Sequence, residues 1–116
     1  MKRDAITYLQ DILDAANKVE NFTSRYTYDQ FLRDDKTQYA VMMAVEIIGE
    51  ATKNIPQHIK DKYPSVPWKD ISGMRDKIVH GYFSVDIEIL WTTAKNNIPS
   101  LIPMIEQVLN NESKNG

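Results

Sequence analysis

Apolar residues recur every three to four positions along most of the chain, which is the spacing of amphipathic helices. The first such run predicts a helix over residues 4–22, with Asp4 as its N-cap. A short helix over 28–33 and a long helix over 35–54 follow, and Pro56 ends the long one. Each long run has one apolar face, so these helices are expected to share a core.

Several prolines interrupt the helical pattern in the second half of the chain. Residues 63–67 are expected to form a loop, because each proline disfavours helix in the residue before it. A third helix is predicted from Trp68 to His80, and Gly81 after it is expected to adopt a left-handed conformation that stops the helix.

The last amphipathic run begins after Asp86, which is a suitable N-cap, and continues to about residue 109. Pro99 and Pro103 lie inside this run. Proline lacks the backbone N–H that a helix interior needs, so a kink or break is expected near residues 96–98.

The chain has 116 residues, enough for one domain with one core. Four amphipathic helices with short connections predict an all-α fold, an antiparallel four-helix bundle with short extra helices and a kinked last helix. We place this domain at residues 1–110 and expect the polar residues 111–116 to form a flexible tail.

Composition excludes several classes of protein. No apolar run approaches the roughly 18 residues of a membrane span, and the first residues lack the apolar segment of a signal peptide. The absence of cysteine excludes disulfides and thiolate metal sites. We therefore expect a cytoplasmic protein with no membrane partner.

The net charge is −2, which is unusual for a nucleic-acid-binding protein, but the charge is unevenly distributed. Residues 53–77 hold six basic and three acidic residues, a local charge of +3. Lys53, Lys69 and Lys77 are therefore weak candidates for RNA contacts. The alternative is that these lysines only form a solvated face.

Three residues whose side chains can take part in a reaction lie close together in the sequence. They are Arg75, His80 and Tyr82, in the pattern R-x-x-x-x-H-x-Y. The guanidinium of arginine binds phosphate through several donors and stays charged. Histidine gives and takes a proton near neutral pH. Together they can cleave a phosphodiester without a metal. By itself, however, a histidine near a helix end is more often a partner of the helix dipole, and the tyrosine could simply pack on the core.

This pattern resembles the signature of the HEPN ribonucleases, specifically the HepT-like toxins of toxin–antitoxin pairs. The segments Trp68–Met74 before it, Val85–Asp86 after it and Glu46–Ala51 further upstream are also similar to that family. The resemblance spans nearly the whole chain and implies a HEPN-like helical fold. It also implies a homodimer, in which the motifs of two protomers face each other across a two-fold axis.

The spacing of Arg75 and His80 poses a geometric problem. Residues five apart on a continuous helix point about 140° apart around its axis. Either the helix loosens before Gly81, or the two side chains converge from different directions. The composite cleft of a dimer is a third solution.

The resemblance implies RNA cleavage that uses the 2′-hydroxyl of the substrate, with no cofactor or metal and no action on DNA. His80 is the expected general base or acid, and Arg75 is expected to hold the scissile phosphate. Asp76 occupies a position where the family often has asparagine. Its carboxylate either orients Arg75 or His80, or repels phosphate.

The same resemblance implies regulation at Tyr82. In the HepT group this tyrosine is adenylylated by a minimal nucleotidyltransferase antitoxin, MntA, which makes the chain the toxin of a type VII-like toxin–antitoxin pair. The alternative function is a non-catalytic helical module that partners a minimal nucleotidyltransferase. Such a module has no need for Arg75 and His80 together.

Several other residues are explained without a role in catalysis. Glu46 and Glu50 share one helix face, but no histidine completes a metal-ligand set with them. Gly49 between them is expected to permit close helix packing. Trp68 and Trp91 are expected to anchor the core or a dimer interface, and no role is assigned to His58.

Overall fold

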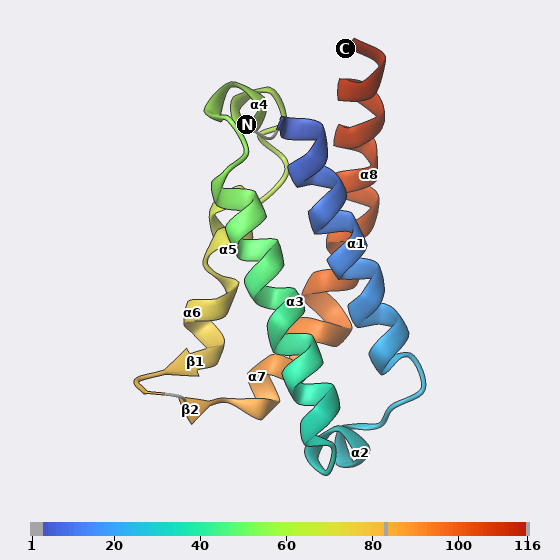
Figure 1. Cartoon of the computed structure of the whole chain (residues 1–116), viewed down its shortest axis with the longest axis vertical. Helices are drawn as coiled ribbons and strands as arrows, with labels where there is room; N and C mark the ends of the chain where they lie inside the picture. Colours follow the sequence, from blue (N-terminus) through green and yellow to red (C-terminus); the bar gives the residue numbers. More distant parts are fainter. Residues whose placement is uncertain (1–3, 83, 116) are drawn as a thin grey trace.

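The computed structural model describes residues 4–82 and 84–115. Three long helices dominate it: α1 (Ala5–Thr23), α3 (Asp35–Lys53) and α8 (Ile98–Asn115). The chain descends through α1, rises through α3 and rises again through α8, so α1 is antiparallel to both (Figure 1). The other elements are α2 (Tyr28–Leu32), α4 (Gln57–Lys62), α5 (Trp68–Ser72), α6 (Met74–Ile78), β1 (Val79–His80), β2 (Ser84–Val85), α7 (Ile87–Thr92) and the π-helix η1 (Thr93–Asn97).

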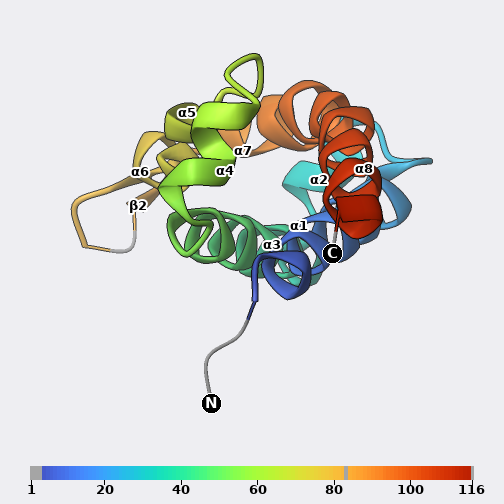
Figure 2. The ribbon, with the colours of Figure 1, turned by 90° about the horizontal axis from the view of Figure 1, so that it is seen from above.

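The helices form two layers around one apolar core. Seen from above, α1 and α3 lie on one side, and α5, α6 and α7 lie on the other (Figure 2). The inward faces of the long helices are fully buried at residues such as Ile12, Val45 and Ile105. Trp91 on α7 packs against Phe31 on α2 with a ring separation of 5.1 Å. The expected all-α architecture is confirmed.

Two helix starts agree with the sequence. The carboxylate of Asp4 accepts a hydrogen bond from the Thr7 N–H, and that of Asp86 accepts one from the Ile89 N–H. Each satisfies a backbone donor that has no partner inside its helix. Within the described ranges, no helix is both long and apolar enough to cross a membrane.

The predicted third helix was wrong in its length and continuity. Gly73, with φ −98° and ψ 3°, separates α5 from α6. The chain then leaves the helix at Ile78, and Val79 is extended. Residues 79–80 pair with 84–85 as a short antiparallel hairpin, so His80 is on a strand. Gly81 has the expected positive φ of 62°, but it turns the hairpin and does not stop a helix.

The predicted disturbance of the last helix is confirmed, and it begins earlier than expected. Residues 93–97 form the π-helix η1, which joins α7 to α8. Pro99 has no N–H to donate to the preceding turn, and the wider i→i+5 pattern removes the need for that bond. Pro103 is accommodated inside α8.

The predicted end of the last helix near residue 109 was also wrong, because α8 continues to Asn115. The carboxylate of Glu112 accepts hydrogen bonds from the Tyr63 hydroxyl at 2.6 Å and from the Lys62 amine at 2.9 Å. These bonds hold the pKa of the Glu112 carboxyl below its usual value. They tie the last turns of α8 to the end of α4.

The Asp34 carboxylate at the start of α3 gives the fold a measurable pH dependence. It accepts bonds from the Tyr26 hydroxyl and from the Thr37 hydroxyl and N–H. The Tyr26 bond and then the Thr37 bonds lower the pKa of Asp34 from 3.8 to about 2. This group therefore stabilises the fold above pH about 4, and its contribution is lost as pH falls toward about 2.

We predict that Asp34→Asn lowers the melting temperature at pH 6 and that the difference from wild type shrinks between pH 4 and pH 2. The measurement is a set of thermal unfolding curves across that pH range. Asp29→Asn, on the exposed first turn of α2, is the matched control. A difference that stays constant down to pH 2 contradicts the assignment.

Candidate active site

The hairpin fixes the direction of His80. Successive side chains of a strand point to opposite faces. Val79 and its partner Val85 are half-buried, whereas His80 and its partner Ser84 are exposed. The imidazole is therefore presented to solvent, while the valines fasten the hairpin to the core. The Asp86 N–H, which donates to the Ile78 carbonyl at 2.8 Å, closes the base of the hairpin.

Arg75 is held by a carboxylate from another helix. Its Nε donates to Glu46 Oε1 at 2.6 Å, which joins α6 to α3. Both side chains are about half exposed, at 49% and 44%. The bond uses Nε, so the terminal nitrogens of the guanidinium still have N–H donors for a phosphate.

Asp76 lies beside the same arginine. Its Oδ1 is 3.6 Å from Arg75 Nη1, a loose ion pair, and its side chain is 79% exposed. This pair is a contact through which Asp76 can orient Arg75, and the same carboxylate offsets part of the charge of the guanidinium. No hydrogen bond or ion pair joins Arg75 to His80 in the part of the chain that the structure describes.

Glu46 is the site residue that the sequence did not reveal. It lies 29 positions before Arg75 in the sequence. The only signal was a carboxylate on a largely apolar helix, which also fits a solvated position. Glu50 on the same helix pairs instead with Lys53 at 3.4 Å.

Gly49 is buried where α3 meets α5, as expected for close packing. A Cβ at this position would lie 3.6 Å from the Ser72 carbonyl oxygen, an ordinary contact. The helices therefore approach closely, but alanine also fits the space.

Tyr82 lies at the tip of the hairpin with 92% of its surface exposed. The alternative that it packs on the core is therefore wrong. Hairpin tips are accessible to other proteins because few contacts restrain them.

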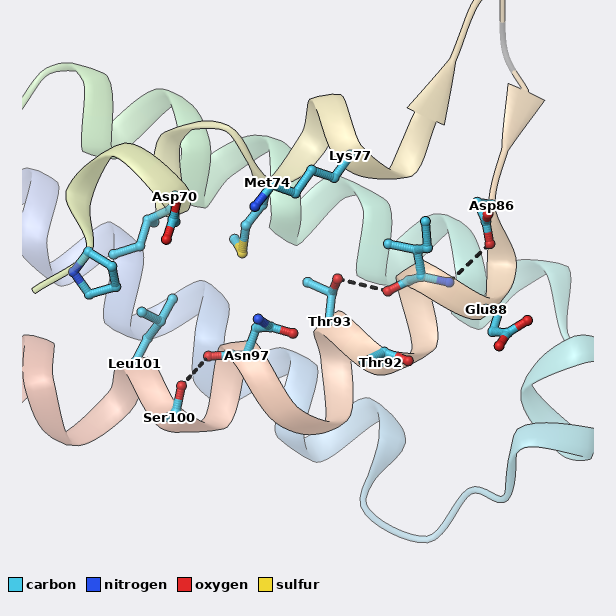
Figure 3. Close-up of a pocket in the computed structure, with 13 residues that line it drawn as sticks. Asp70, Met74, Lys77, Asp86, Glu88, Thr92, Thr93, Asn97, Ser100 and Leu101 are labelled. Atoms are coloured by element: carbon cyan, nitrogen blue, oxygen red, sulfur yellow. Dashed lines mark hydrogen bonds between the residues drawn. The ribbon is translucent and has the colours of Figure 1, made fainter.

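The three candidate lysines are dispersed. Lys53 is at the end of α3 in its ion pair with Glu50, and Lys69 is exposed on α5. Lys77 lines a cavity of about 530 Å³ between α5–α6 and α7–η1–α8. Figure 3 shows this cavity, which has Asp70 and Glu88 on its walls.

The cavity in Figure 3 does not include Arg75, His80 or Tyr82. Its carboxylates, including that of Asp86, outnumber its single amine. A phosphate backbone is repelled by such a lining. The chemistry of the motif is therefore presented on the surface beside α3 and not in this cavity.

We predict that Glu46→Ala releases the Arg75 side chain without unfolding the protein. Both groups are half exposed, so the loss of unfolding free energy should be about 1 kcal/mol or less. The Nε–H signal of Arg75 in NMR should exchange faster with water than in wild type. Glu50→Ala, which breaks only the pair with Lys53, should leave that signal unchanged. An equal exchange rate of the Arg75 Nε–H in Glu46→Ala and in wild type contradicts the restraint of Arg75 by Glu46.

Comparison with known proteins places the chain in a family. A model of the family described as ribonuclease HepT-like matches residues 12–108. A probable ribonuclease HepT of Thermococcus cleftensis is 48% identical over 93% of this chain and 98% of its own length. A putative RNase of Methanocaldococcus jannaschii is 44% identical over 93% of this chain and 89% of its own.

A putative RNase of Caldanaerobacter subterraneus is 37% identical over 90% of this chain and 94% of its own length. No solved structure matches the chain significantly. The match of the family model over most of the chain, together with these relatives, confirms the resemblance seen in the motif: the chain belongs to the ribonuclease HepT-like family.

Proposed function

We propose that this member of the family is an endoribonuclease that cuts RNA without a metal, through Arg75 and His80. The observation that carries the proposal is the paired placement of these residues. Arg75 is anchored to Glu46 through its Nε and is half exposed, and His80 is turned to solvent by the hairpin that follows directly. The relatives named as ribonucleases support the same activity.

The reaction needs these groups, the substrate and a general acid, a role that the His80 of a second copy can fill. The His80 imidazole takes the proton of the 2′-hydroxyl, and the oxygen attacks the adjacent phosphorus. The bond from phosphorus to the 5′-oxygen breaks, and that oxygen takes up a proton from a general acid. The products are a 2′,3′-cyclic phosphate and a 5′-hydroxyl, so DNA is not cut. Arg75 offsets the charge that grows on the phosphoryl oxygens.

We further propose that two copies form the complete site. Met43 and Ile47 on α3 are 62% and 42% exposed, and Phe22 on α1 is 41% exposed. They line one shallow cavity of about 360 Å³ between the two helices. Such a cluster of exposed apolar side chains is typical of an interface. Glu46, which holds Arg75, is adjacent to Ile47, so a two-fold axis there brings two motifs toward each other.

We predict that purified wild-type protein cleaves RNA in the presence of a chelator and leaves 2′,3′-cyclic ends. His80→Ala and Arg75→Ala should each lose at least about 100-fold in rate, since each removes one catalytic interaction. Mapping of RNA ends measures both the products and the target. His58→Ala, remote from the motif, is the control. Loss of activity in all variants, or none, contradicts the assignment.

Mixing of subunits tests the composite site. If two His80 residues serve one cleft, mixing wild type with an equal amount of His80→Ala should lower the activity per wild-type chain to about half. Independent sites predict no change. A folded dimer that never cuts RNA would instead favour the non-catalytic partner of a nucleotidyltransferase.

We also propose that the chain is the toxin of a toxin–antitoxin pair in the cytoplasm and that a minimal nucleotidyltransferase silences it by adenylylating Tyr82. The exposure of Tyr82 at the hairpin tip supports access by such an enzyme. Tyr82 follows His80 by two residues, so an attached AMP lies next to the proposed catalytic group. Its phosphate can occupy Arg75 in place of RNA.

We predict that Tyr82→Phe retains ribonuclease activity but accepts no AMP from the cognate transferase. Incorporation of labelled AMP and growth of cells that express both proteins are the measurements. Tyr39→Phe, which alters another exposed tyrosine, should still be modified and neutralised. Full neutralisation of Tyr82→Phe through the transferase activity contradicts the proposal.

A further inference from the structure

A second cavity lies at the foot of the hairpin, on the side of α3. It has a volume of about 510 Å³ and is bounded by the first half of α3, by β2 and by α7. Val85 on its wall pairs with Val79, the residue before His80. The cavity therefore adjoins the hairpin that carries His80, on the face that Val79 and Val85 share.

The apolar part of this cavity suits a flat ring. Leu90 is fully buried at its base, and Met42, Val85 and Ile87 are half-buried around it. Tyr39 on the rim is 78% exposed, although it is a large aromatic side chain. Exposed aromatic rings beside apolar walls are common stacking platforms for nucleobases.

The polar part of the cavity offers hydrogen-bond acceptors. The Gln38 amide nitrogen donates to the carbonyls of Phe31 at 2.8 Å and Leu32 at 3.3 Å. Its orientation is thereby fixed, and its Oε1 remains as an acceptor. The Asp35 carboxylate makes no hydrogen bond or ion pair within the described ranges. Two acceptor groups thus face one cavity, and neither is used by the fold.

We propose that this cavity binds a guanine base of the RNA substrate next to the scissile phosphate. Guanine presents an N1–H and an exocyclic amine along one edge, and a carboxylate accepts both. The ring stacks on Tyr39 and contacts Met42 and Val85. Uracil presents one N–H between two carbonyls, which oppose Asp35 and Gln38. The role of this cavity in RNA cleavage rests on the proposed ribonuclease function, whereas the binding of guanine itself does not.

The volume agrees with this occupant. Cavities for small ligands are mostly apolar with a few placed polar groups, and roughly 300 Å³ is enough for one. None of the described residues that line the site is basic, so the site is suited to the base and leaves the phosphate to Arg75. The protein then selects the base through hydrogen bonds to the edge of its ring. Each well-placed pair of such hydrogen bonds discriminates about tenfold or more against the wrong base.

The first test is binding, which needs no catalysis. Guanosine 5′-monophosphate and uridine 5′-monophosphate are titrated into His80→Ala protein and followed by NMR. Guanosine monophosphate should bind at least about tenfold more tightly. Asp35→Asn should remove that preference, because an amide presents donors to the donors of guanine. Tyr39→Leu should weaken both nucleotides, since it removes the stacking surface while leaving Asp35 in place.

Asp29→Asn, an equivalent loss of charge on α2, should change neither affinity. Equal affinities for the two nucleotides, or a preference that survives Asp35→Asn in a protein with an unchanged melting temperature, overturns the proposal.

The second test separates this proposal from the ribonuclease itself. Wild-type protein is offered RNA oligonucleotides that differ only in the base on either side of one cleavable bond. Preferential cutting beside guanine, lost in Asp35→Asn, supports both proposals. Cutting with no base preference overturns the guanine site and leaves the ribonuclease intact. Selective binding of guanosine monophosphate without any cutting upholds the guanine site and counts against the ribonuclease.

Discussion

The end of α6 at Ile78 is the constraint on which the arrangement of the motif depends. The Asp86 N–H donates to the Ile78 carbonyl, and Val79 and Val85 press the hairpin on the core. Had the helix continued to His80, the imidazole would point about 140° away from Arg75. The strand instead turns His80 outward beside the helix that carries the arginine. One backbone transition thus presents His80 to solvent directly after the helix that carries Arg75.

The second determinant is α3, which carries several further parts of the proposed sites on one rigid scaffold. Glu46 on one flank holds Arg75, and Met43 and Ile47 present the exposed apolar surface on which we propose a second copy. Near its first turn, Asp35 and Gln38 line the cavity at the foot of the hairpin. Groups on one helix keep fixed spacing, so the anchor of the arginine, the proposed subunit contact and the proposed base site are held in fixed positions relative to one another.

The sequence predicted much of this fold, because the helix period and the caps are local signals. The long helices, the Asp4 and Asp86 caps and the disturbance before Pro99 all follow from neighbouring residues. The prediction of one helix over Trp68–His80 was wrong at its end. The apolar spacing suits a helix, but pairing with residues 84–85 makes residues 79–80 a strand. The contact of Glu46 with Arg75 could not be predicted for the same reason. The two residues are 29 positions apart in the sequence, and only tertiary packing joins them.

The exposure of the motif explains why a second subunit belongs in the proposed mechanism. Arg75 is half exposed, His80 is exposed, and the Arg75–Glu46 pair is open to water. Charge–charge attraction at such a site is weak because water screens it, whereas catalysis of this kind gains most where water is excluded. In the proposed dimer, a partner on Met43 and Ile47 covers the neighbouring Glu46 and strengthens its bond to Arg75. The proposed second copy also adds a second imidazole, so the acid and the base need not be one residue. Under the same proposal, an AMP on the tyrosine at the hairpin tip places its bulk at the entrance of the cleft between the two copies.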